Sequence, residues 1–312
     1  MSTISSNKVS VIDFSSKDLK PGTSSWTLVR TKVRAALEEY GCFELVLNDT
    51  VQLHQDMLDS LKHLFDLPLE TKAKHVSDDG FEGYTGNTQV MPLFEYMNIN
   101  DIVSNHELLQ RFTNLMWPEG NPSFCETMYS YCKLLSELEA IVKRMVFESF
   151  GMEKYYDSYV ELTSYMGRPM KYRAPTTKET TLGMVTHTDF GFITILGQNH
   201  VNGLNIQAKN GEWISVTPSA SSFVVVIGDA FMAWSNGRLH SPPHGVWMSG
   251  DEIRYSMGLF SSSKDIVQTP QELIDEEHPL LFKPFHHMAL RIFARTEEGR
   301  KAESFIKGYC GV

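Results

Sequence analysis

The feature that most limits the fold of this chain is a series of short apolar runs in its second half. Three of them, rich in β-branched and aromatic residues, lie at residues 192–196, 222–227 and 254–260. Gly, Asn or Pro residues bound these runs, as is usual for strands. Asn-Gly pairs, which favour two-residue hairpin turns, occur at Asn202-Gly203, Asn210-Gly211 and Asn236-Gly237. Repeated hairpins of short strands predict a sandwich or a barrel.

The first half of the chain is predicted to be mainly helical. Apolar residues recur every three or four positions from Trp26 to Tyr40, which is the spacing of an amphipathic helix. The same spacing occurs over residues 51–65, and again after Pro122 until about Gly151. Short strands are expected at residues 9–14 and 42–46. Residues 77–92 are rich in Asp, Gly and Asn, so we expect a loop there.

Together these patterns predict an α+β fold with a double-stranded β-helix (jelly-roll) core. We expect the chain to divide into three parts. Residues 1–161 form a helical N-terminal region packed on the core, residues 162–268 form the jelly-roll core, and residues 269–312 form a C-terminal helical segment.

The composition excludes several classes of function. The formal net charge is -10, whereas nucleic-acid binding needs clustered Lys and Arg. No apolar run approaches the roughly 20 residues of a membrane span, and the first residues lack the apolar stretch of a secretory signal. The four cysteines are scattered and form no CxxC pair, which fits a reducing compartment. We therefore expect a cytoplasmic protein that binds neither nucleic acid nor membranes.

The stretch His187-Thr188-Asp189 is the most informative about chemistry. Residues i and i+2 of a strand share a face, so His187 and Asp189 can reach one metal ion. A second His from another strand would complete the facial triad of non-haem Fe(II) oxygenases, and the absence of cysteine ligands disfavours structural zinc. The residues alone leave several candidates for that second His: His200, His240, His244, His278, His286 and His287.

Three further segments follow this motif along the chain. They are residues 228–238, His244-Gly245-Val246 and Arg254-Tyr255-Ser256. In this order they resemble the plant 2-oxoglutarate/Fe(II)-dependent dioxygenases, which carry HxD, a distal His some fifty-odd residues later, and RxS ten positions beyond that. Here Asp189 and His244 are 55 positions apart and His244 and Arg254 are 10 apart. The resemblance therefore implies His187, Asp189 and His244 as the catalytic iron ligands.

The resemblance extends along nearly the whole chain, and three segments are similar to one branch of the family. Residues 92–95, 170–175 and 198–204 look like those of the glucosinolate side-chain-modifying AOP enzymes, and the steroidal glycoalkaloid hydroxylases of nightshades are also similar. This implies a monomeric enzyme of plant specialised metabolism. It would oxidise a C–H bond of a small molecule and release succinate and carbon dioxide. Hydroxylation is the default outcome, and desaturation, O-demethylation and ring closure are alternatives that start from the same hydrogen abstraction.

The resemblance also implies how the co-substrate 2-oxoglutarate binds, with ascorbate as an auxiliary reductant. Its far carboxylate needs a cation, and the planar Arg fork meets a carboxylate bidentately. Arg254 and Ser256 share one face of a strand, and the resemblance assigns both to this carboxylate, with Tyr172 as a further hydrogen-bond donor.

Three positions depart from the family pattern. Met170 stands where Asn is common, Arg173 where Pro is common, and Gly245 where Arg usually follows the distal His. None removes a metal ligand. The loss of Arg after His244 is expected to change the support of the metal centre and to open space near the substrate.

Two other functions compete with a 2-oxoglutarate dioxygenase. An ascorbate-dependent oxidase would keep the same iron ligands and RxS, and a catalytically silent jelly roll would only bind a small molecule. Asp189 argues against halogenation, because halogenases that resemble this family have a small residue there. An apolar substrate pocket is expected from aromatic residues near these motifs. The candidates are Phe94, Tyr96, Phe190, Phe192 and Phe260.

Overall fold

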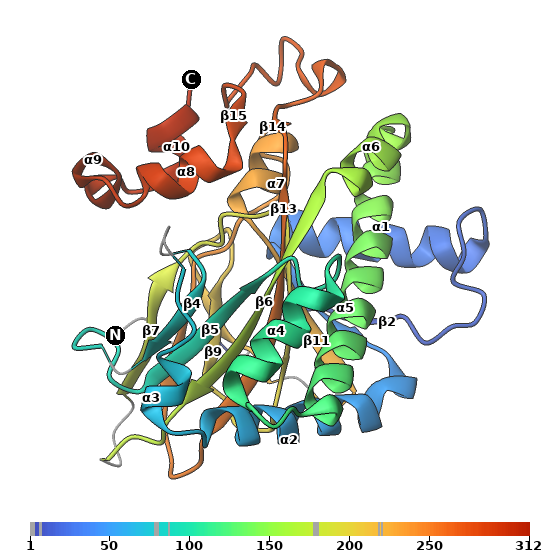
Figure 1. Cartoon of the computed structure of the whole chain (residues 1–312). Coiled ribbons are helices and arrows are strands. Elements are labelled where there is room, and N and C mark those ends of the chain that lie inside the picture. Colours follow the sequence, from blue (N-terminus) through green and yellow to red (C-terminus); the bar gives the residue numbers. More distant parts are fainter. Residues whose placement is uncertain are drawn as a thin grey trace.

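The computed structural model describes residues 4–5, 8–77, 81–86, 88–176, 181–217, 219 and 221–312. Two β-sheets face each other at its centre (Figure 1). The larger sheet has the strand order β2 (Val11–Asp13), β3 (Cys42–Val46), β11 (Ser222–Ile227), β8 (Ile193–Gln198), β13 (Arg254–Ser263), β6 (Thr163–Tyr172), β5 (Phe94–Asn100), β4 (Gly83–Gly86). The smaller sheet has the order β1 (Ile4–Ser5), β10 (Trp213–Ser215), β9 (Leu204–Gln207), β12 (His244–Met248), β7 (Thr181–His187).

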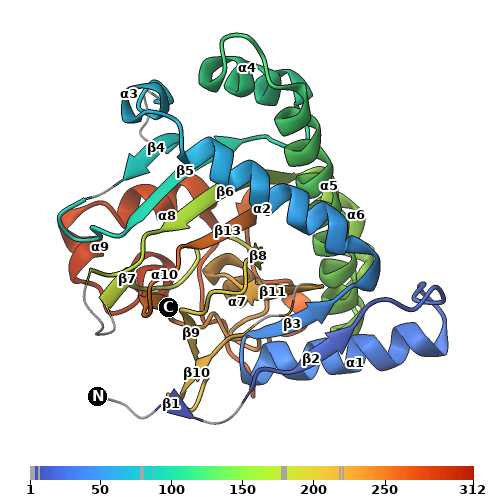
Figure 2. The ribbon, with the colours of Figure 1, turned by 90° about the horizontal axis from the view of Figure 1, so that it is seen from below.

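Helices cover the outer face of the larger sheet (Figure 2). They are α1 (Ser24–Glu39), α2 (Val51–Phe65) and α5 (Pro122–Ser149), with the short α3 (Leu69–Lys72), α4 (His106–Met116) and α6 (Tyr156–Glu161) beside them. Side-chain caps fix where the main ones begin: the Thr23 hydroxyl accepts from the Trp26 N–H, and Asn121 accepts from the Phe124 N–H. Their apolar faces and the outward side chains of the sheet form the main core.

The alternation of side chains along each strand separates this main core from a second one between the sheets. In β11, Phe223, Val225 and Ile227 face the helices, whereas Val224 and Val226 face the smaller sheet. All are buried because both faces of the sheet are covered, which explains why this run is continuously apolar. The candidate site lies in the second, inter-sheet core.

The C-terminal segment lies at one end of the sandwich (Figure 1). It contains α8 (His287–Phe293), α9 (Glu297–Lys301) and α10 (Phe305–Cys310), preceded by the two-stranded sheet of β14 (Ile266–Val267) and β15 (Phe285–His286). The remaining α-helix of the described residues, α7 (Asp229–Trp234), follows β11 and is buried. The expected jelly roll with helices in the N- and C-terminal regions is confirmed.

Two details differ from the predictions or qualify them. Residues 77–92 are not wholly a loop, because β4 lies within them and pairs with β5 beyond them; residues 78–80 and 87 lie outside the described residues. Strands β2 to β5 of the N-terminal region join the larger sheet, so the division into three parts stays a prediction. No helix in the described part of the chain combines the length and apolar character needed to cross a bilayer.

Candidate active site

The first group of site residues joins two strands of the smaller sheet. His187 ends β7 and His244 begins β12, and the two are direct partners in the antiparallel ladder. Asp189 follows His187, and its two carboxylate oxygens each lie 3.9 Å from the Nε2 of one histidine. Within the described residues this is the one group of three potential metal ligands, with all ligand atoms within 4.8 Å of one another. The structure thus brings the three predicted residues together.

Backbone contacts fix which ring nitrogen of each histidine carries a proton. The Nδ1 of His187 lies 2.9 Å from the Val185 carbonyl oxygen, and that of His244 lies 3.1 Å from the Pro242 carbonyl. A carbonyl only accepts, so each Nδ1 carries a proton, and a neutral ring in this tautomer offers the lone pair of its Nε2 to a metal ion. Burial and the neighbouring His244 ring lower the pKa of His187 to about 4. Two neutral imidazoles beside a carboxylate form a donor set that suits Fe(II).

Hydroxyl groups hold the carboxylates around this centre. The Thr194 hydroxyl donates to Asp189 Oδ2 over 2.6 Å. Burial would raise the pKa of Asp189, but the two histidines and this hydrogen bond outweigh it and lower the pKa. Behind them, Asp229 accepts from the hydroxyls of Thr188 at 3.0 Å and Ser241 at 2.7 Å. Asp229 thereby connects the segments that carry His187 and His244.

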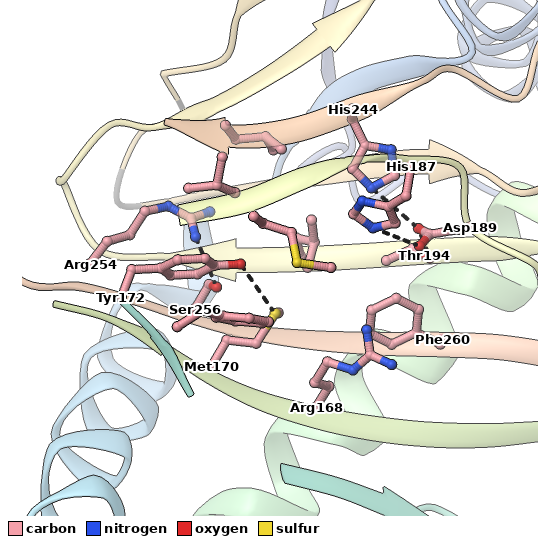
Figure 3. A pocket seen from close by; sticks show the side chains of 15 residues that line it. Arg168, Met170, Tyr172, His187, Asp189, Thr194, His244, Arg254, Ser256 and Phe260 are labelled. Carbon is pink, nitrogen blue, oxygen red and sulfur yellow. Dashed lines mark hydrogen bonds and ion pairs between the residues drawn. The ribbon is translucent and has the colours of Figure 1, made fainter. Parts of the chain in front are cut away.

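The second group lies on the larger sheet, at the other side of the same cavity (Figure 3). Arg254, Ser256 and Tyr172 all point into it, and Arg254 is the direct ladder partner of Tyr172. Arg254 is 1% exposed, and its guanidinium lies 5.0 Å from the centre of the Tyr172 ring and donates to Ser256 Oγ and Gln198 Oε1. Among the described residues no carboxylate pairs with it, and its Nε has no hydrogen-bond partner.

A buried cation without an anion is energetically costly, so this arrangement indicates a site for an anionic ligand. Gln198 was not predicted to belong to it. Its amide nitrogen donates to the Val201 carbonyl over 3.0 Å, which turns its oxygen toward Arg254. The pairing of the strands would have revealed Gln198. Ser256 of β13 pairs with Gln198 of β8 on one side and with Met170 of β6 on the other.

A wider cavity of about 380 Å³ leads from His187 and Asp189 to the surface, a size that suits a small molecule. Four of the five predicted pocket residues line it: Phe94, Tyr96, Phe190 and Phe260. Phe192 does not; it packs 5.2 Å from the Phe231 ring in the main core, 2% exposed. Phe192 lies just before the first residue of β8 and is therefore outside the strand. The alternation of side chains along β8 does not apply to it and does not turn it toward the cavity. Helices α8 and α10 close the outer side through His287, Arg291 and Phe305.

The departures from the family pattern have distinct structural consequences. A Cβ atom at Gly245 would lie 2.9 Å from the Trp247 ring, which packs against Trp213. The space beside Gly245 is therefore filled by Trp247 and does not enlarge the cavity, contrary to expectation. Met170 lines the inner cavity, where its sulfur accepts from the Tyr172 hydroxyl at 3.8 Å. Arg173 is exposed and donates to the Pro92 carbonyl.

His287, which lines the wider cavity, should make the fold sensitive to acid. Burial, Arg291 and His286 lower its pKa to about 4, and its Nδ1 has no partner among the described residues. The unfolded chain binds the proton near pH 6.5 but the folded chain only near pH 4, so stability falls as the pH drops through this window. We expect the free energy of unfolding to fall by about 2 kcal/mol more in the wild type than in His287→Phe between pH 7.5 and 5.

Urea unfolding at the two pH values measures this difference. The control is His63→Phe, which should keep the wild-type pH dependence, because His63 is exposed on α2 and is not one of the groups that lower the pKa of His287. An identical slope in wild type and His287→Phe would contradict the assignment.

Comparison with known proteins identifies the family. The family model of the 2OG-Fe(II) oxygenase superfamily matches residues 160–263, and that of the "non-haem dioxygenase in morphine synthesis N-terminal" region matches residues 9–120. The Arabidopsis thaliana protein named "Probable 2-oxoglutarate-dependent dioxygenase AOP1.2" is 43% identical over 308 residues, which cover 96% of this chain and 94% of that protein. The chain belongs to the 2-oxoglutarate/Fe(II)-dependent dioxygenases.

Solved structures of this family agree. The dioxygenase for auxin oxidation of rice is 26% identical, with a TM-score of 0.81 over 98% of this chain and all of that one. The Arabidopsis thaliana dioxygenase for auxin oxidation 1, solved as a complex with 2-oxoglutarate, is 26% identical, with a TM-score of 0.78 over 87% of this chain and 99% of that one. The predicted membership in the AOP-like branch is confirmed. The chain is a 2-oxoglutarate-dependent dioxygenase, and neither alternative function is favoured.

Proposed function

We propose that His187, Asp189 and His244 hold the Fe(II) of this dioxygenase through two Nε2 atoms and one carboxylate oxygen. The support is their convergence within 4.8 Å and the fixed tautomers of both histidines. Three protein ligands leave coordination positions for a co-substrate and oxygen. Bound iron would supply the oxidation of a substrate C–H bond, coupled to conversion of 2-oxoglutarate to succinate and carbon dioxide.

Arg254, Ser256 and Tyr172 are proposed to bind the far carboxylate of 2-oxoglutarate. The observation that carries this proposal is the buried Arg254 guanidinium, which has no carboxylate partner among the described residues and faces the cavity that His187, Asp189 and His244 also line. A carboxylate at this place would pair with the cation and accept from the two hydroxyls. Gln198 holds the guanidinium plane in position through its 2.7 Å hydrogen bond.

The substrate is proposed to be a small plant specialised metabolite that enters the wider cavity and is hydroxylated. Phe94, Tyr96, Phe190 and Phe260 would form its apolar walls. We further propose that the enzyme works as a monomer in the cytoplasm, without nucleic-acid or membrane partners. The acidic composition and the four buried, unpaired cysteines support this.

The visible charge-transfer band of an anaerobic Fe(II)·2-oxoglutarate complex tests these assignments. We expect the band in the wild type, no band in His244→Ala, and a band in Arg254→Ala only at much higher 2-oxoglutarate concentrations. Iron binding without any band in the wild type would contradict the co-substrate site. Failure of the wild type to bind iron would contradict the metal site.

A further inference from the structure

Arg168 is a charged side chain that lines both cavities, and the proposed iron and co-substrate sites do not use it. It lies on β6 two residues before Met170, on the strand face that turns toward the smaller sheet. Its side chain lines both the inner cavity and the wider one, together with His187 and Asp189. Figure 3 shows its guanidinium beside Phe260, across the cavity from Asp189.

The surroundings of Arg168 hold its guanidinium in one orientation but use only part of its hydrogen-bonding capacity. Its Nε donates to Asn98 Oδ1 over 2.7 Å, and its guanidinium carbon lies 4.5 Å from the centre of the Phe260 ring and 5.1 Å from that of Tyr96. Two aromatic contacts and one amide hydrogen bond fix the plane of the fork. Among the described residues no carboxylate pairs with it, and Asp189 is the one acidic residue among those that line the wider cavity.

Two terminal nitrogens of this fork therefore remain to bind a ligand in the cavity. Because Asp189 is assigned to the metal, it cannot also neutralise Arg168. The walls around the fork are aromatic, formed by Phe94, Tyr96 and Phe260. A ligand that matches this lining has an apolar body and one oxyanion group, which meets a planar Arg fork bidentately.

We propose that Arg168 is a substrate-binding residue that selects organic anions, holding a carboxylate or sulfate of the substrate while its apolar part lies near the metal centre. This inference rests on the proposed function, because it needs the iron and 2-oxoglutarate sites to lie where the preceding section assigns them. Arg168 then sets specificity: it fixes one end of the substrate and thereby decides which C–H bond faces the iron. A neutral isostere of the same size would leave the fork unpaired and bind more weakly.

Three probes that share a 3-phenylpropyl group and differ in their terminal group test the effect of charge. They are 4-phenylbutanoate, 3-phenylpropyl sulfate and the neutral 4-phenylbutanamide. Their binding is measured by anaerobic titration calorimetry of the full chain loaded with Fe(II) and saturating 2-oxoglutarate, so that the Arg254 site is occupied. We expect at least one of the two anions to bind the wild type tenfold or more tightly than the amide. The anion that binds more tightly identifies the oxyanion class.

Variants then assign this preference to a residue. Arg168→Gln should lose the preference for anions, and Arg168→Lys, which keeps the charge but not the fork, should retain only part of it. Arg173→Gln is the matched control, because Arg173 is exposed on the same segment and outside both cavities. It should keep the full preference.

The charge-transfer band of each sample distinguishes this inference from the proposed function. If the wild type lacks the band, the proposed function fails. If the band is present, the inference is overturned by equal binding of anions and amide, by no anion binding at all, or by an unchanged preference in Arg168→Gln. It is also overturned if Arg168→Gln weakens 2-oxoglutarate binding instead, since Arg168 would then serve the co-substrate.

Discussion

The variant Arg254→Met is expected to weaken 2-oxoglutarate binding by about 30-fold or more without weakening the metal-free fold. Truncating one partner of a buried, hydrogen-bonded charge pair costs about 2–5 kcal/mol, and each 1.4 kcal/mol corresponds to a factor of ten. The effect should be confined to the co-substrate, because Arg254 has no contact with His187, Asp189 or His244.

The stability part of this prediction separates a ligand site from a structural ion pair. Replacing a buried ionic group by an apolar side chain of similar volume is often neutral or stabilising. Arg254 has no carboxylate partner among the described residues, so its removal leaves no anion unpaired. Only Gln198 Oε1 and Ser256 lose a donor, which limits any gain. We expect the free energy of unfolding to stay within about 1 kcal/mol of the wild type or to rise.

Titration of the charge-transfer band with 2-oxoglutarate measures the affinity, and urea unfolding of the metal-free protein measures the stability. Arg254→Lys is the matched variant: a point charge without the fork should restore part of the affinity. A strongly destabilised Arg254→Met with unchanged 2-oxoglutarate affinity would mean that Arg254 serves the fold and not the co-substrate.

The sequence predicts the residues whose partners lie close along the chain or on one strand face. Arg254 and Ser256 share a face because they are two positions apart in β13, as expected from strand periodicity. Gln198, Arg168 and Asp229 were missed because their roles depend on strand register and on contacts across the fold, which periodicity does not encode. Gln198 reaches Arg254 only because β8 pairs with β13 in the observed register.

The error at Phe192 and the extra strands have related causes. Phe192 was assigned to the pocket by its closeness to His187 and Asp189 in the sequence, but the chain bends between Asp189 and β8 and turns this ring into the main core. Strand β4 is short and polar, and it is stabilised by pairing with β5, which a local pattern cannot reveal. Tertiary context decides both cases.

The second large effect is expected from Asp189→Ala, which should abolish turnover and weaken Fe(II) binding by more than two orders of magnitude. Asp189 supplies the one negative charge of the ligand set, and its removal leaves two neutral imidazoles. Replacing a residue that only orients a metal ligand typically costs about 10–100-fold in affinity, so loss of the ligand itself must cost more.

Thr194→Val tests the hydrogen bond that supports the Asp189 carboxylate. This variant keeps the ligand but removes the 2.6 Å hydrogen bond to Asp189 Oδ2, so we expect a loss of about 10–100-fold in Fe(II) affinity. The control is Asp275→Ala, which breaks an Asp–His contact of 2.9 Å with His278 on the exposed surface. The loss of Fe(II) affinity, measured by anaerobic titration, should therefore increase from Asp275→Ala, which loses none, through Thr194→Val to Asp189→Ala. If Asp189→Ala binds Fe(II) like Asp275→Ala, the metal does not lie at this cluster, because an anionic ligand cannot be lost from its coordination sphere without cost.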